Sequence, residues 1–247
     1  MLHPQKARLA AIRELRRLAR PAGEFDASRY FRGADTLGFY NVGTKAVRAM
    51  ARALGAETRA IWSIKDATAF ADLMLRDAHL EAKAIGLELL ARRRREFGPW
   101  LLPVCKRWLA GNLSANWATT DSMCGSVLGP MLVREQSLLE REMPKWARHR
   151  NMWVRRAAAV ACLPSIRRGL ALDTGYAIAA TLHPDGEDLI QKAVGWMLRD
   201  LGDQDMARLA RYLRSNGPRI PRTTVRYAIE HFPSAKRGEL LESTRDR

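Results

Sequence analysis

A tryptophan and an aspartate near the middle of the chain have residue types and a spacing that could serve catalysis. Trp117 and Asp121 lie in the segment Asn-Trp-Ala-Thr-Thr-Asp-Ser, so on a helix they share one face about one turn apart. A carboxylate can stabilise a developing positive charge, and an aromatic face can do so through its quadrupole. Alone, the pair is weak evidence, because a half-buried tryptophan near a surface aspartate is common.

A second tryptophan is surrounded by basic residues. On a helix, Trp196 has Lys192 four residues before it and Arg199 three residues after it. Arg155 and Arg156 lie on the helix expected one repeat earlier. Aromatic faces interleaved with cations are typical of nucleic-acid clefts, where cations hold phosphates and flat rings contact sugars and bases. These residues are therefore candidates for DNA binding beside Trp117 and Asp121.

The net charge also favours a polyanionic partner. The chain of 247 residues contains 42 Lys and Arg against 26 Asp and Glu, a formal net charge of +16. The excess is uneven, since residues 141–168 hold eight basic side chains and a single acidic one, Glu142. Such clustering suits a phosphate backbone better than a small acidic metabolite. Duplex DNA is the expected partner, although many basic proteins have unrelated functions.

The hydrophobic pattern predicts an all-α fold built from repeats. Apolar residues recur at spacings of three and four, and no stretch alternates as a strand would. Similar segments begin at residues 80, 117, 153 and 189, intervals of 37, 36 and 36, and a looser copy begins at Ile220. This period is typical of HEAT-like repeats. We predict one domain over residues 1–247, an α-solenoid superhelix with a basic concave groove.

The fourth position of the repeat is basic in three copies, and two interpretations are about equally supported. The residues are Lys83, Arg156 and Lys192. On successive helices they could form a stripe of cations that follows the curved DNA backbone. They could equally cap or pair with groups inside the scaffold.

Other functional classes have little support in the sequence. The three cysteines lack metal-ligand or disulfide spacing, and the five histidines do not pair at such spacing. We therefore expect neither a metal nor a cofactor. No apolar run approaches the roughly 18–20 residues that a membrane span needs, and the basic N-terminal segment is expected to be a first helix rather than a signal peptide. We predict a cytoplasmic, nucleoid-associated monomer without membrane contact, since the polar C-terminal tail is typical of a free end.

Three ordered segments resemble the AlkD family of DNA alkylation repair glycosylases. They are Asn-Trp-x-x-x-Asp-Ser from residue 116, Trp-Val-Arg-Arg-Ala-Ala from residue 153 and Leu-Ile-Gln-Lys-Ala-Val-Gly-Trp-Met-Leu-Arg-Asp from residue 189. The resemblance implies a superhelix of HEAT-like repeats, in agreement with the period. It also implies that Asp121 is the catalytic carboxylate, that Trp117 and Trp196 contact the lesion's deoxyribose, and that Arg156 holds the backbone.

The resemblance further implies excision of cationic N3- and N7-alkylpurines in base excision repair, without a base-flipping pocket. An alkylated purine of this kind already carries positive charge and is a good leaving group, so no strong general acid is required. Family members also contact DNA through N-terminal helices. Tyr30, Phe39 and Tyr40 are the aromatic candidates here, but their segment follows the family pattern only loosely.

Two other functions remain open at this level. A repeat protein of the same fold could bind DNA or RNA without catalysis, with Asp121 serving as a helix cap. A protein–protein adaptor is the commonest use of HEAT-like solenoids, and an acidic partner would fit the charge. The sequence does not choose between small methyl adducts and bulky genotoxin adducts as the lesion.

Overall fold

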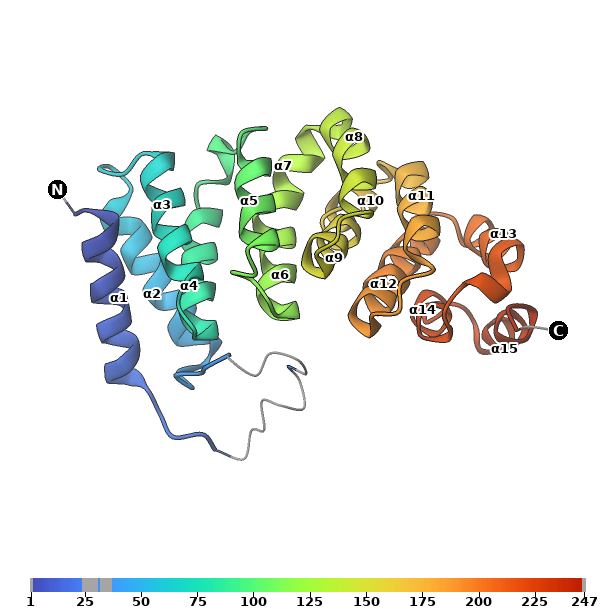
Figure 1. Cartoon of the computed structure of the whole chain (residues 1–247), viewed down its shortest axis with the longest axis horizontal. Helices are drawn as coiled ribbons and strands as arrows, with labels where there is room; N and C mark the ends of the chain where they lie inside the picture. The colour runs from blue at the N-terminus through green and yellow to red at the C-terminus, as the bar shows by residue number, and fades with distance from the viewer. Residues whose placement is uncertain (1, 24–30, 32–36, 246–247) are drawn as a thin grey trace. The chain divides into compact units, whose positions relative to one another are not determined.

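The predicted all-α class is confirmed by the computed structural model, which describes residues 2–23, 31 and 37–245 (Figure 1). Within these ranges the backbone forms no strand, and a single isolated bridge joins Gly38 to His79. The chain divides into two compact units, Met1–Val127 and Leu128–Arg247. The single domain and the concave groove expected from the sequence stay predictions.

The helices of the two units follow one another with short connections. In unit 1 they are α1 (Pro4–Leu18), α2 (Gly43–Thr58), α3 (Ile64–Leu75), α4 (Leu80–Ala91), the short η2 (Arg94–Glu96), α5 (Leu101–Ala110) and α6 (Trp117–Met123). A π-helical turn, η3 (Cys124–Leu128), follows α6. In unit 2 they are α7 (Gly129–Arg134), α8 (Gln136–Trp146), α9 (Met152–Val160), α10 (Leu163–Ile166), α11 (Leu172–Leu182), α12 (Asp188–Gln204), α13 (Met206–Asn216), η4 (Gly217–Arg219), α14 (Arg222–Ala228) and α15 (Ser234–Ser243).

The repeat read from the sequence is confirmed as a repeat of helix pairs. The segments beginning near residues 80, 117, 153 and 189 are α4, α6, α9 and α12, and the looser fifth copy is α14. In unit 1, α4 packs against α2 and α6. In unit 2, α12 packs against α9 and α14, while α8 and α11 form the second layer. Because no helix pair can bury its apolar face alone, the stacking of neighbours supplies the core of this α-solenoid fold.

Side-chain hydrogen bonds fix the start of α3 and join it to α5 in unit 1. Ser63 and Asp66 form a reciprocal capping box that begins α3, an arrangement that satisfies two backbone donors. Six residues after Asp66, Asp72 Oδ1 accepts a hydrogen bond from the buried Trp108 of α5 at 2.7 Å. The paired arginines Arg76 and Arg107 help to keep the pKa of Asp72 below its usual value despite its burial. The carboxylate therefore joins α3 to α5 in its charged form.

A buried histidine joins α11 to α13 in unit 2. His183 Nε2 lies 2.7 Å from the hydroxyl of Tyr212, whose ring packs 4.8 Å from that of Tyr176. Burial, with a smaller effect from the nearby Arg219, lowers the pKa of His183 to about 4. The imidazole is therefore neutral in the folded protein at neutral pH.

This histidine predicts that acid destabilises the protein. In the unfolded chain His183 takes up a proton near pH 6.5, whereas the folded protein resists protonation down to about pH 4. Stability is thus lost as the pH falls through this interval, by roughly 3 kcal/mol at about 1.4 kcal/mol per pKa unit. Urea unfolding at pH 7 and pH 4.5 should show a smaller pH dependence for His183→Gln than for the wild type. Equal pH dependence in both proteins would contradict this assignment.

Candidate active site

The N-terminus of α6 sets the positions of Trp117 and Asp121. Asn116 has extended backbone angles, and its side-chain oxygen accepts the N–H of Thr119 at 2.8 Å. Asparagine is among the most favourable N-cap residues, so α6 begins at Trp117. The preceding loop is held by Thr120, whose hydroxyl donates to the carbonyl of Ser114 at 2.8 Å. Trp117 is thus the first residue of the helix, and Asp121 lies one turn later on the same face.

Asp121 is not the cap of this helix. The capping hydrogen bond is made by Asn116, which is 2% exposed, whereas Asp121 is the fifth residue of α6 and half-buried. One structural explanation for an aspartate in this segment is thereby removed. A half-buried carboxylate one helical turn from a tryptophan fits a role toward a bound cation.

An aromatic residue that the sequence reading did not select covers Trp117. The ring of Phe31 stacks on the indole with centroids 5.3 Å apart and planes 8° apart. Phe39 packs 5.5 Å from Phe31, so three aromatic rings form a continuous cluster. The adjacent aromatic pair Tyr30-Phe31 is the signal that the sequence offers, but the predicted candidate is Tyr30, which lies outside the described residues.

Tyr40, another aromatic candidate from this segment, serves the scaffold. Its ring is buried and stacks on His79 at 4.0 Å. Its backbone N–H donates to the carboxylate of Glu81 at 3.1 Å, as does that of Asn41 at 2.7 Å. These contacts anchor the chain before α2 to the first turn of α4. A direct DNA contact by Tyr40 therefore has no support, whereas Phe39 belongs to the cluster beside Trp117.

In unit 2, Trp196 lies half-buried on α12 beside an arginine that the sequence reading did not name. The guanidinium carbon of Arg167, which follows α10, is 5.7 Å from the centroid of the indole. Arg167 Nε also donates to Asp200 at 2.7 Å, and Asp200 lies one turn after Trp196. Asp200 is buried, and this burial raises its pKa in spite of Arg167. The carboxylate thus holds the arginine over the tryptophan.

The predicted DNA-binding cations of unit 2 all have partners within the protein. Arg156 is 5% exposed and donates to the carbonyl of Leu189 on the next repeat. Arg155 pairs with Asp185 at 2.6 Å. The other two lie on α12: Lys192 pairs with Asp188 at 2.8 Å, and Arg199 pairs with Glu230. Because Lys192 is half-exposed and its partner is on its own helix, it can turn toward an external phosphate at little cost.

Lys83 is the equivalent of Arg156 in unit 1, and its contacts support the scaffold interpretation. Its ammonium group donates to the carbonyls of Leu75 and Leu113, which precede and follow its own helix. The side chain is 8% exposed, and burial lowers its pKa. Lys83 and Arg156 therefore both hydrogen-bond a backbone carbonyl of the following repeat. At these two positions the repeated cation connects neighbouring repeats.

The predicted site residues are brought together in two groups. Trp117 and Asp121 belong to unit 1, whereas Arg156 and Trp196 belong to unit 2. Within unit 2, Arg156 reaches the first turn of the helix that carries Trp196. The assembly of all four side chains around one lesion stays a prediction.

The described part of the chain contains no group of three or more His, Cys, Asp or Glu side chains placed to hold a metal ion. Cys105, Cys124 and Cys162 are all buried, and none of the three forms a disulfide bond. Burial raises the pKa of the Cys162 thiol to about 12 and raises that of Cys105 as well. In the same described ranges, no helix is both long enough and apolar enough to span a bilayer.

Comparisons with known proteins agree with the fold and identify a family. The family model described as DNA alkylation repair enzyme matches residues 11–232. A solved structure described as a predicted DNA alkylation repair enzyme from Enterococcus faecalis superposes with a TM-score of 0.72 at 16% sequence identity. The match covers 81% of this chain and 91% of that chain. No curated protein sequence gives a match.

Proposed function

Because the chain belongs to the family of DNA alkylation repair enzymes, we propose that it is a DNA glycosylase for cationic N3- and N7-alkylpurines in duplex DNA. The observation that carries this proposal is the face of α6, where Asp121 lies one turn from Trp117 and is not used as a helix cap. Repair of alkylated DNA is the function of the family. The glycosylase reaction and its substrates are the proposed refinement.

The chemistry suits a site with one carboxylate and no strong acid. The bond between C1′ of the deoxyribose and the purine nitrogen breaks, and its electron pair neutralises the cationic base, which leaves without protonation. Positive charge develops on the sugar, where the carboxylate of Asp121 stabilises it. Water then adds to C1′ and loses a proton, leaving an abasic site. Electrostatic stabilisation by one preorganised group typically lowers the activation free energy by about 3–4 kcal/mol.

Trp117 and Trp196 are proposed to contact the same deoxyribose. An aromatic face beside a developing cation contributes roughly 0.5–2 kcal/mol. Such contacts read the sugar and the backbone rather than the base, so the lesion need not rotate into a pocket as it does in most glycosylases. A site of this kind would tolerate adducts larger than a methyl group.

The cations Arg156, Lys192, Arg199 and Arg155 are proposed to hold the DNA backbone near the lesion. These cations differ in how much free energy is needed to break their present contacts and turn toward a phosphate. Lys192 gives up only a pair within its own helix, whereas Arg156 is buried against the Leu189 carbonyl. We therefore assign the first phosphate contact to Lys192 and a positioning role to Arg156. Lys83, whose ammonium group is buried, is the weakest candidate.

The test is release of 7-methylguanine or 3-methyladenine from N-methylated duplex DNA. We expect free methylpurine and alkali-labile abasic sites in equal amounts, and none from unmethylated DNA. Salt-sensitive DNA binding without base release would instead identify a non-catalytic DNA-binding scaffold. Absence of DNA binding at low salt would favour the protein–protein adaptor.

A further inference from the structure

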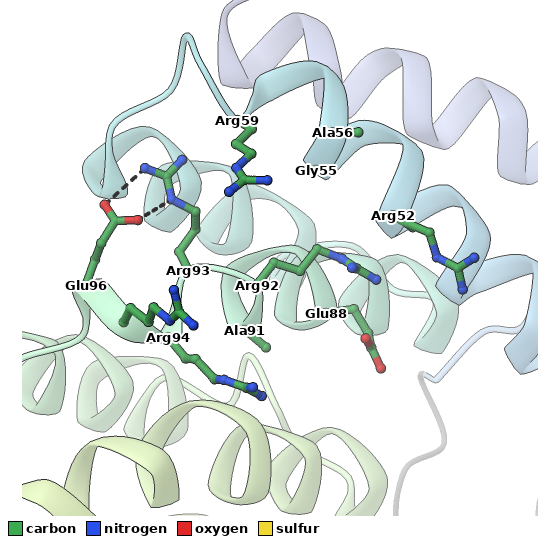
Figure 2. A pocket seen from close by; sticks show the side chains of 11 residues that line it. Arg52, Gly55, Ala56, Arg59, Glu88, Ala91, Arg92, Arg93, Arg94 and Glu96 are labelled. Atoms are coloured by element: carbon green, nitrogen blue, oxygen red, sulfur yellow. Dashed lines mark hydrogen bonds and ion pairs between the residues drawn. The ribbon is translucent and has the colours of Figure 1, made fainter.

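An arginine-rich pocket lies in unit 1 away from Trp117 and Asp121. It has a volume of about 810 Å³ and is bounded by the C-terminal halves of α2 and α4 and by η2 (Figure 2). Six arginines line it against two glutamates: Arg52, Arg59, Arg92, Arg93, Arg94 and Arg95. Arginines near helix C-termini are favoured by the helix dipole, but that effect acts on one or two charges and does not account for six.

The acidic residues of the pocket already have partners. Arg93 pairs with Glu96 and also donates to the carbonyl of Trp62 at 3.0 Å, so this arginine holds η2 against the chain before α3. Glu88 lies 3.6 Å from Arg48 outside the pocket. Arg93 is thus structural, and the two glutamates pair with Arg48 and Arg93 rather than with Arg52, Arg59 or Arg92.

Three of the remaining arginines form a row. Arg52 and Arg59 are seven residues apart on α2, two turns on one face, and therefore about 10 Å apart along the helix. Between them on that face is Gly55, where a Cβ atom would lie 2.9 Å from Cδ of Arg92. The side chain of Arg92 thus rests on α2 between the other two (Figure 2). We call Arg52, Arg92 and Arg59 the arginine row.

The arginine row is exposed and has no acidic partner in the described ranges. All three side chains are exposed to solvent, and none of them makes an ion pair with a described residue. Three neighbouring like charges repel one another unless an anion lies among them. Guanidinium groups match phosphate oxygens in geometry as well as charge. The row is about 10 Å long, which is longer than a single phosphate group. Its length therefore fits several consecutive phosphates of a nucleic-acid strand.

We propose that the arginine row binds the sugar–phosphate backbone of duplex DNA outside the lesion site, an inference that rests on the proposed function. Neither Trp117 nor Asp121 lines the pocket. Lys83, whose ammonium group contacts the loop before α6, and Arg92 are nine residues apart along α4. This corresponds to about 13 Å, or the rise of about four base pairs. The row therefore contacts flanking phosphates and contributes affinity without taking part in bond cleavage.

The test compares two triple variants of equal charge. In the row variant, Arg52, Arg59 and Arg92 are replaced by Gln. In the control variant, three exposed arginines outside the pocket and outside the N-terminal helices, Arg211, Arg219 and Arg237, are replaced by Gln. The affinity for an unmodified duplex of about 20 base pairs is measured from 50 to 300 mM salt. Each lost phosphate contact lowers the magnitude of the slope of log K against log salt by about 0.9. We therefore expect this slope to fall by about 2 to 3 in the row variant and by less than about 1 in the control variant.

Catalysis provides a separate measurement. With enzyme in saturating excess over methylated duplex, the row variant should release 7-methylguanine at the wild-type rate. An unchanged salt slope in the row variant, or a loss equal to that of the control, would overturn the proposal. The proposal would also be overturned if the wild type bound ADP tightly, the row variant lost this binding, and the salt slope for DNA were the same in both proteins. The pocket would then be a site for a free nucleotide. A wild-type protein that binds DNA but releases no base would refute the glycosylase and still leave the slope comparison decisive.

Discussion

Asp121→Asn is expected to lower the single-turnover rate of 7-methylguanine release by about 100- to 1,000-fold. The substitution keeps the size of the side chain and removes the negative charge that faces the developing sugar cation. Loss of one preorganised electrostatic group commonly costs this much. The helix should be unaffected because its cap is Asn116, not Asp121. DNA affinity should be unchanged or slightly higher, since one repulsive charge is removed.

The matched control for this variant is Glu140→Gln on α8. Glu140 is exposed, and its replacement changes the net charge by the same amount. Rates should be measured with enzyme in excess over methylated duplex, so that product release does not mask the chemical step. If Asp121→Asn released base as fast as Glu140→Gln, the proposed catalytic role of the carboxylate would be wrong.

Gly195→Ala is expected to lower the free energy of unfolding by about 3 kcal/mol. Gly195 lies on α12 where this helix contacts α14. A Cβ atom there would lie 2.4 Å from Cβ of Tyr227 and 2.8 Å from the carbonyl oxygen of Thr224. Neither neighbour can rotate away, because one is the first side-chain atom and the other is backbone. The helices must therefore separate, and overpacking of this kind costs typically 1–3 kcal/mol or more.

Gly238→Ala on α15 provides the control for this substitution. A Cβ atom at Gly238 would meet no other atom within 4 Å, so only helix propensity changes, and alanine is favoured by up to about 1 kcal/mol. Unfolding by urea, followed by circular dichroism, should shift to lower denaturant for Gly195→Ala and slightly higher for Gly238→Ala. Equal stability of the two variants would show that α14 can move away from α12 without cost.

The sequence predicts the repeat well because the repeat is a local pattern. Segments starting near residues 80, 117, 153 and 189 all lie at the start of helices, since their apolar residues must face neighbouring repeats. Asn116 before Trp117 likewise acts through its own helix as the N-cap. These features depend on residues only a few positions away in the chain, so the spacing of residue types in the sequence is enough to predict them.

The surroundings of the candidate site could not be predicted in the same way. Phe31 reaches Trp117 across 86 positions, and Arg167 reaches Trp196 across 29, and neither pair has a repeating spacing. The role of Lys83 depends on one carbonyl at the end of α3 and one in the loop before α6, which side-chain types alone do not indicate. Charge at the fourth repeat position was visible in the sequence, but whether it faced solvent or backbone depended on packing.

The burial of all three cysteines has a consequence for a protein of this family. Alkylating agents that damage DNA also attack soft nucleophiles, and a thiolate reacts much faster than a thiol. Cys105, Cys124 and Cys162 are shielded from solvent, and raised pKa values keep at least Cys105 and Cys162 protonated at neutral pH. The fold thereby protects these cysteines from alkylation by the same reagents whose DNA damage the family repairs. The protein can therefore remain active while such reagents are present.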